Sequence, residues 1–210
     1  MPLLDLSHPL TMKTPVYPGD PAVRLTPWET ALPWRVTELV LGSHSGTHMD
    51  APRHCLPDGA TIDAYGPDRW VGSGVVLPVP NPESDEAVGP GILAGLPAEL
   101  PVGWFAIIAT GWDRFWGASE YFYHPFLAPD LAESLRGAGC GLVAVDVPSV
   151  DSSVSGGDAV HRILADADIL IVENLRGLER LPVGAALEFC FAPLPLAGTD
   201  GAPVRAFARF

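Results

Sequence analysis

Three histidines and an aspartate gather within eleven consecutive residues in the first third of the chain. His44, His48, Asp50 and His54 occupy this window, and the 210-residue sequence contains 6 histidines in all. Neutral imidazole and carboxylate groups are the ligands that borderline divalent ions such as Zn²⁺ or Mn²⁺ take in proteins. The window therefore indicates a metal site.

The intervals within this window indicate a compact segment rather than a long helix. His44 and His48 are four residues apart, so a single turn would place both rings on one side of the chain. Gly46 lies between them, and Pro52 disfavours helical angles at the preceding residue. We predict a strand over residues 36–41 that leads into a tight loop carrying the ligands.

Two alternatives stay open for the window. The same residues could be capping and turn residues on a solvated loop, although three histidines at such positions serve no turn chemistry. Cys55 adjoins His54. Its thiol is either an extra ligand or nucleophile, or a small side chain packed beside the site.

The window resembles a motif of a known family. Residues 44–54 read His-Ser-Gly-Thr-His-Met-Asp-Ala-Pro-Arg-His. This stretch is similar at all eleven positions to the pattern His-x-Gly-Thr-His-x-Asp-x-Pro-x-His of the metal-dependent cyclase family, which includes bacterial kynurenine formamidases and isatin hydrolases. The resemblance implies that His44, His48 and Asp50 are metal ligands and that His54 is the general acid/base.

A second pair of residues completes the comparison with the family. His161 lies in a predicted short helix, and Glu173 ends an apolar strand over residues 168–173. In kynurenine formamidases a histidine and a glutamate at a similar interval complete a two-metal site. The resemblance therefore implies that His161 and Glu173 are ligands and that Asp50 and Glu173 bridge two ions. Taken alone, His161 fits a structural histidine in a helix equally well.

The N-terminal segment also resembles the family, which opens with Ser-His-Pro and an aromatic residue before Pro-Gly-Asp. In kynurenine formamidases this aromatic residue is typically Trp and lines the substrate pocket, whereas here it is Tyr17. The resemblance implies a substrate-binding role for Tyr17, with packing across a proline-rich turn as the alternative. His8 is either structural or a ligand.

Four further residues have two interpretations each. Asp146 and Asp151 follow a predicted strand and are either ligands or turn formers. The family has a similar strand leading into Thr-Gly near its active site, and Trp112 or Trp116 after this strand either faces an aromatic substrate or packs in the core.

Short strands and two helices must position these groups. The clearest helix is predicted over residues 129–137, where Pro129 suits the start and Leu131 and Leu135 share a face. A buried strand over residues 141–146 follows, which favours α/β layers. Further strands are predicted over residues 3–6, within 26–41, over 71–80, 104–110 and 168–173, and on both sides of a turn at 198–201.

The pattern alone indicates a mixed α/β fold in one domain, residues 1–210, and the resemblance implies more. Members of the family form a swivelling β/β/α domain in which a few helices flank a central barrel-like mixed sheet. The resemblance also implies a homodimer or homotetramer in which an extended N-terminal arm, about residues 1–30 here, reaches a neighbour's site. We predict Trp28 and Trp34 in the core, with a pocket wall or a subunit contact as alternatives.

The charge balance limits the classes of partner. The chain carries 12 Lys and Arg residues against 25 Asp and Glu residues, a formal net charge of −13. Such a surface repels phosphate backbones and anionic headgroups, so we expect a small-molecule substrate and neither nucleic acid nor membrane. Three separated cysteines and an N-terminus without the basic region of a signal peptide predict a cytoplasmic protein.

The resemblance implies metal-dependent hydrolysis of an amide bond, with N-formylkynurenine or a related aryl amide as the expected substrate. Two Zn²⁺ or Mn²⁺ ions per chain would provide hydroxide for attack on the carbonyl, and His54 would move the proton to the departing nitrogen. One alternative is an isatin hydrolase-like opening of a cyclic amide with one metal ion. The other is non-catalytic binding of a metal ion or an aromatic acid, against which the fourth imidazole argues.

Overall fold

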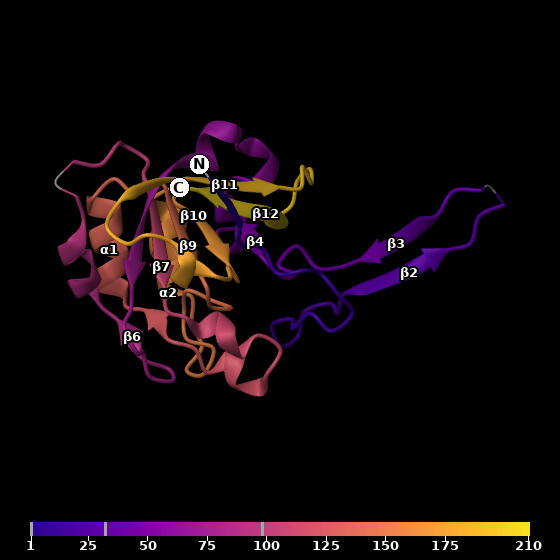
Figure 1. The fold of residues 1–210 in the computed structure, drawn as a ribbon, viewed down its shortest axis with the longest axis horizontal. Coiled ribbons are helices and arrows are strands. Elements are labelled where there is room, and N and C mark those ends of the chain that lie inside the picture. Colours follow the sequence, from indigo (N-terminus) through magenta and orange to yellow (C-terminus); the bar gives the residue numbers. More distant parts are fainter. Residues whose placement is uncertain (1, 32, 98) are drawn as a thin grey trace.

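A sheet-centred body and one projecting β-hairpin make up the molecule (Figure 1). The computed structural model describes residues 2–31, 33–97 and 99–210. The body holds both chain ends, the two α-helices and the strands of the main sheet, and the ends lie close together. Within the described residues, neither helix is long and apolar enough to cross a membrane.

Eight strands form the main sheet, in the order β1-β12-β11-β5-β7-β9-β10-β4. Its parallel part follows the order β5-β7-β9-β10, and the other pairings are antiparallel. The bounds are β1 (Leu3–Asp5), β4 (His48–Asp50), β5 (Val71–Pro78), β7 (Phe105–Ala109), β9 (Leu142–Val145), β10 (Leu170–Glu173), β11 (Ala186–Pro193) and β12 (Gly201–Arg209).

The long strand β12 closes the sheet on itself. One of its edges pairs with β11, while the other pairs first with β4 and then with β1. Because β4 also pairs with β10, seven strands form a closed mixed barrel and β1 lies beside β4 as the eighth. This confirms the predicted barrel-like mixed sheet with a few helices.

Two apolar layers lie on the two faces of the parallel strands. Met49, Ile107 and Val172 belong to the cluster inside the barrel, whereas the adjacent Ile108 and Ile171 belong to a second cluster outside it. This follows from the alternation of side chains along a strand. The outer cluster is covered by α1 (Pro129–Gly137) and α2 (Ala159–Asp166). The helix predicted over residues 129–137 is α1, whose bounds agree with the prediction.

The projecting hairpin consists of β2 (Arg24–Trp28) and β3 (Val36–Val40). These strands pair with each other in a sheet of two. Trp28 is 59% exposed and Trp34 is 66% exposed, so the prediction that both lie in the core is wrong. The reason is that, within the described residues, no second layer covers the hairpin. A third small sheet pairs β6 (Ala87–Val88) with β8 (Phe126–Leu127).

The segment predicted as an N-terminal arm, about residues 1–30, is divided in the structure. Its start, β1, belongs to the main sheet. Its middle includes Pro15 and Tyr17, which line a cavity of their own chain. Its end, β2, belongs to the hairpin that projects from the body.

Candidate active site

Strand register brings three of the predicted ligands together. β4 pairs with β10 so that His48 lies opposite Glu173 and Asp50 lies opposite Ile171. Because side chains alternate between the faces of a strand, Met49 points into the barrel. His48, Asp50 and Glu173 therefore share the outer face of the barrel, on the side of the helices.

The ligand-bearing segment is part turn and part strand, which corrects the tight loop predicted after residue 41. His44 lies in a turn, residues 48–50 form β4, and His54 ends the short 3₁₀ helix η1 (Pro52–His54). β4 pairs with β10 on one edge and with β12 on the other. Both partner strands are far along the chain, so local spacing could not reveal the strand.

His161 reaches the same face from the first turn of α2. Asp151 accepts hydrogen bonds from the backbone N–H groups of Val160 and His161, both at 3.0 Å, and from His161 Nδ1 at 2.7 Å. First-turn N–H groups have no partner within their helix, so one carboxylate holds both the helix start and the ring. His161 Nε2 then faces Asp50 Oδ2 at 3.6 Å and Glu173 Oε1 at 3.5 Å.

His48 is held in the same way by a backbone carbonyl. Its Nδ1 donates a hydrogen bond to Gly46 O at 2.8 Å. Its Nε2 lies 3.3 Å from Asp50 Oδ1 and 3.4 Å from Glu173 Oε2. Outer hydrogen bonds of this kind orient metal-binding imidazoles, so His48 and His161 both present Nε2 to the same two carboxylates.

The donor set fits a divalent cation. Asp50 Oδ2 is buried and has no hydrogen-bond donor among the described residues. The distances from the Nε2 atoms of His48 and His161 to the carboxylate oxygens are 3.3, 3.4, 3.5 and 3.6 Å. Ligand atoms about 2.0–2.1 Å from a tetrahedral Zn²⁺ lie about 3.3–3.4 Å from each other. Each histidine nitrogen and its neighbouring carboxylate oxygens are therefore spaced as ligands of one ion are.

His44 lies between two carboxylates. Its Nδ1 is 2.7 Å from Asp50 Oδ1, and its Nε2 is 3.0 Å from Asp200 Oδ2. Gly201 makes room for the ring, because a Cβ at this position would lie 2.9 Å from His44 Cε1. Ser43 Oγ donates to the other oxygen of Asp200 at 2.9 Å. The turn before β4 and the turn before β12 thus meet at His44.

The carboxylates control the protonation of these rings. Burial alone would lower the pKa of His44, but Asp50 and Asp200 raise it to about 10. Burial also opposes the charged form of His48, yet Asp50 and Glu173 raise its pKa to about 9. In the metal-free chain, ring protons therefore neutralise the carboxylates. Metal binding requires such protons to leave.

His54 lies at the exposed edge of this centre. Its side chain is 36% exposed, compared with 14% for His44 and 11% for His161. The ring centroids of His54 and His44 are 4.0 Å apart, and those of His54 and His161 are 5.6 Å apart. Its Nδ1 is 3.5 Å from Asp200 Oδ2. His54 is thus within reach of both the other rings and solvent.

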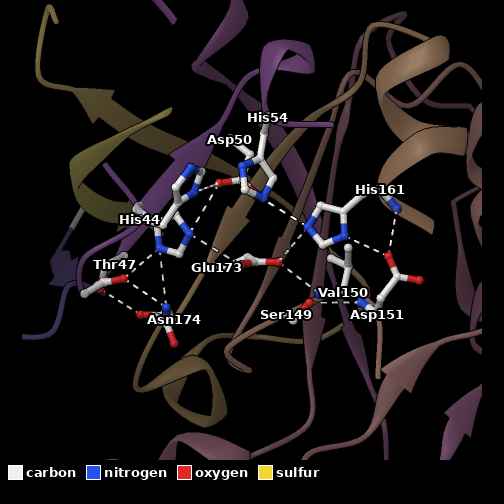
Figure 2. A network of polar contacts seen from close by, with 12 residues as sticks. His44, Thr47, Asp50, His54, Ser149, Val150, Asp151, His161, Glu173 and Asn174 are labelled. Carbon is white, nitrogen blue, oxygen red and sulfur yellow. Dashed lines mark hydrogen bonds and ion pairs between the residues drawn. The ribbon is translucent and has the colours of Figure 1, made fainter. Parts of the chain in front are cut away.

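A cavity of about 630 Å³ opens onto the centre and includes Tyr17 in its wall. Figure 2 shows Asp50 and Glu173 between His44 on one side and His161 with Asp151 on the other, with His54 above them. All six residues with predicted ligand or acid/base roles therefore gather in one place. Their roles remain predictions.

Several residues with open interpretations lie apart from the centre. The ring of His8 stacks on Trp116 with centroids 3.8 Å apart, and burial lowers the pKa of this histidine to about 4. Trp112 is buried and donates from Nε1 to Tyr121 O at 3.2 Å. Asp146 accepts hydrogen bonds from Thr110 and Gly111. These contacts are structural, whereas Cys55 lines the cavity.

Asp200 is the main site residue that the sequence analysis missed. The turn at residues 198–201 and the following strand are predicted correctly, but only as a connection between strands. Asp200 contacts His44 and His54 because β12 pairs with β4. A signal is present in the sequence, because residues 198–201 read Gly-Thr-Asp-Gly and this stretch resembles one near the C-terminus of the family.

Comparison with known proteins bears on this arrangement. The family model described as "Putative cyclase" matches residues 4–152. A kynurenine formamidase of Bordetella pertussis is 33% identical over 223 residues, which cover 99% of this chain and 97% of the relative. The chain belongs to the cyclase family. A second such enzyme, from Paracidovorax citrulli, is 31% identical over 226 residues, with 99% and 96% covered.

Solved structures agree with membership of the cyclase family. An isatin hydrolase bound to the product analogue thioisatinate has a TM-score of 0.86 and 22% identity, with 98% of this chain and 91% of that chain covered. At this identity the likeness concerns the fold. A structure described as a "Potential Metal-Dependent Hydrolase With Cyclase Activity" has a TM-score of 0.81 and 27% identity, with 99% and 96% covered.

Proposed function

We propose that this cyclase-family protein is a metal-dependent hydrolase of an amide bond, with N-formylkynurenine or a related aryl amide as its substrate. The kynurenine formamidases that match nearly the whole chain support an amide substrate. The observation that carries the proposal is the convergence, beside one open cavity, of His44, His48, Asp50, His54, His161 and Glu173.

The proposed cofactor is a pair of divalent cations, Zn²⁺ or Mn²⁺. Asp50 and Glu173 each direct one oxygen toward His48 and the other toward His161, and His44 adds a third ring on the His48 side. These residues would hold two ions, one on the side of His44 and His48 and one on the side of His161, and both carboxylates would contribute to each. A bound divalent cation polarises a carbonyl oxygen and makes water nucleophilic near neutral pH.

His54 is proposed to move the proton. Asp200 Oδ2 lies 3.5 Å from its Nδ1, which leaves Nε2 as the nitrogen available to the substrate. Imidazole is the side chain most often used for general acid–base catalysis. His54 would take a proton from the attacking water and return it to the departing nitrogen, so that the acid and the amine products form without a net change in the enzyme.

The cavity wall supports an aryl substrate that carries a carboxylate. Tyr17 and Phe122 meet edge to face, with ring centroids 6.2 Å apart, and both line the cavity. Among the described lining residues, Arg162 is the only lysine or arginine. Its Nε donates to Asp158 Oδ2 at 2.7 Å, which leaves the two Nη groups as donors for an anionic group.

The assembly is proposed to be a homodimer or homotetramer. The hairpin exposes large apolar side chains, namely Trp28, Trp34, Val36 and Leu39. Exposed apolar surface of this kind commonly marks a protein–protein contact.

The proposed location is the cytoplasm. The three cysteines are free of disulfides, which fits this location.

A substrate panel with counted metal tests the proposal. The protein is stripped with a chelator, reloaded with Zn²⁺ or Mn²⁺, and assayed with N-formylkynurenine, isatin and simple anilides. We expect about two ions per chain and metal-dependent turnover of N-formylkynurenine. One ion per chain with turnover of isatin would favour the cyclic-amide alternative. A folded, metal-loaded protein that turns over none of these amides would contradict the proposal and favour binding alone.

A further inference from the structure

The residue that follows Glu173 forms a buried link between His48 and Tyr121, another residue of the cavity wall. Asn174 is 6% exposed and Tyr121 is 1% exposed. Tyr121 OH donates to Asn174 Oδ1 at 2.7 Å. On the other side of the amide, Asn174 Nδ2 donates to Gly46 O at 2.9 Å and lies 3.4 Å from His48 Nδ1.

We propose that Tyr121 and Asn174 are positioning residues that hold His48 through the carbonyl of Gly46. The inference rests on the proposed function, because it assigns His48 to a metal centre. Neither residue is required to touch the reacting atoms. Their contribution is to keep His48 Nδ1 bonded to the backbone, so that Nε2 remains directed at Asp50 and Glu173.

The orientation of the amide carries the argument. Gly46 O accepts hydrogen bonds from both His48 Nδ1 and Asn174 Nδ2. If the amide were reversed, Asn174 Oδ1 would face this carbonyl oxygen and would compete with it for the Nδ1 proton of His48. The carbonyl oxygen of Gly46 can only accept, so it selects the Nδ2 side of the amide, and the phenol of Tyr121 supplies the donor for Oδ1 on the other side.

The backbone of Asn174 is fixed from two further directions. Its N–H donates to Val147 O at 3.0 Å, and its carbonyl accepts from Thr47 Oγ1 at 2.7 Å. Its φ of 59° lies in the left-handed region, which asparagine adopts more readily than most residues. The side chain is therefore aimed by a rigid backbone at the end of β10, immediately after the ligand Glu173.

The position of Asn174 also links the two halves of the site. Gly46 and His48 come from the sequence motif, whereas Asn174 follows β10 and Tyr121 lies in the 3₁₀ helix η6 (Ser119–Phe122). Figure 2 shows Asn174 beside Thr47, on the side of the centre opposite His161. The network thus plays for His48 the part that Asp151 plays for His161.

Two substitutions and a matched control test the proposal. Tyr121→Phe removes only the hydroxyl that bonds the amide, and Asn174→Ala removes the amide without adding a charge beside His48. Tyr65→Phe is the control. It also removes the hydroxyl of a tyrosine that donates to a side-chain oxygen, Asp168 Oδ1 at 2.5 Å, but this bond lies outside the site. Denaturant unfolding of all variants shows that each is folded before it is compared.

The first measurement is metal affinity, by competition with a chelator for Zn²⁺. Loss of an outer hydrogen-bond partner of a metal-binding histidine typically costs about 10–100-fold in affinity. Gly46 O stays bonded to His48 in both variants, so we expect a loss of about tenfold, at the lower end of this range, for Asn174→Ala, a loss of about three- to tenfold for Tyr121→Phe, and a change of less than about threefold for Tyr65→Phe. The double variant should lose no more than Asn174→Ala alone, since both act through one network.

The second measurement is independent of metal and of catalysis. In ¹⁵N-histidine-labelled metal-free protein, NMR follows solvent exchange of the His48 Nδ1 proton, which we expect to become at least tenfold faster in Tyr121→Phe. Wild-type affinity and exchange in both variants would overturn the proposal. Variants that change KM but neither of these readouts would show that Tyr121 and Asn174 serve only as cavity wall. If exchange changes while no variant or parent binds metal, the proposed function fails but the hydrogen-bond network stands.

Discussion

Two antiparallel strand pairs in this protein reverse the usual distribution, in which polar side chains are exposed and apolar ones are buried. The pair β4–β10 carries His48 and Glu173 opposite each other, and these residues are 2% and 4% exposed. The pair β2–β3 ends at Trp28, which is 59% exposed. Ionisable groups are therefore buried and a tryptophan is exposed. In these two pairs, burial is set by what packs against the strands and not by the hydrophobicity of the residues.

The physical reason differs for the two pairs. β4 and β10 belong to a closed barrel with an apolar interior on one face and α2 on the other, so their outward side chains are enclosed. Buried charges are tolerated when they are paired or bind a cation, and the imidazoles and carboxylates of the centre pair with each other. The hairpin is a two-stranded sheet, which has no second layer within the described residues.

The largest expected effect comes from removing the bridging carboxylate. Asp50 Oδ1 faces His44 and His48, and Oδ2 faces His161. Asp50→Asn replaces one of these oxygens by an NH₂ group, which is a poor metal ligand. We expect metal content to fall below one ion per chain. Turnover should fall by more than about 10⁴-fold, which is the largest loss usually seen when a single proton-transfer group is removed. Metal analysis and steady-state kinetics check this. If the variant retained both ions, Asp50 would not be a metal ligand.

Loss of the exposed imidazole should separate proton transfer from metal binding. His54→Ala should keep its metal ions and lose about 10²–10⁴-fold in turnover. Cys55→Ser is the matched control, because Cys55 is the next residue and lines the same cavity; its turnover should stay near that of the parent. Near-full activity of metal-loaded His54→Ala would exclude the proposed proton shuttle.

The affinity of the centre for metal should depend on pH, because His44 and His48 are protonated in the metal-free chain. The pKa of His44 is raised to about 10 and that of His48 to about 9 in the metal-free chain. Below these values a cation must displace ring protons, so affinity should fall as pH falls, by about tenfold per pH unit for each proton released. Calorimetry in buffers of different ionisation enthalpy counts the protons. An affinity independent of pH would contradict protonation of these rings.

Substitutions in the hairpin are expected to have the smallest effect on the stability and metal content of the body. The double variant Trp28→Thr, Trp34→Thr should change the free energy of unfolding by about 0.5 kcal/mol or less, as is usual for surface substitutions, and should keep its metal. It should nevertheless dissociate a dimer or tetramer in sedimentation velocity. Val102→Thr, at a fully exposed body position (100%), is the control. A wild-type assembly state in the double variant would exclude the hairpin as the subunit contact.

The same contrast explains what could be predicted from the sequence. His44, His48, Asp50 and His54 are recognisable because they are close in the chain, and the helix over residues 129–137 because its start and apolar spacing are local signals. His161 and Glu173 are predictable only through the resemblance to a family, since their approach to the motif depends on the pairing of β10 with β4.

The remaining features depend on contacts between distant parts of the chain. Asp200 contacts His44 because β12 pairs with β4, and Asn174 contacts Gly46 because β10 lies beside β4. Neither residue type is unusual in a turn or after a strand. The exposure of Trp28 and Trp34 likewise depends on the absence of a covering layer among the described residues, which hydrophobicity does not encode.

The most direct test of the metal centre is a crystal grown with Mn²⁺ and measured at a wavelength where manganese scatters anomalously. We predict two peaks of anomalous density beside Asp50 and Glu173, one on the side of His44 and His48 and one on the side of His161. Density that lies elsewhere, or side chains of the two segments that face apart with no ion between them, would contradict the central claim.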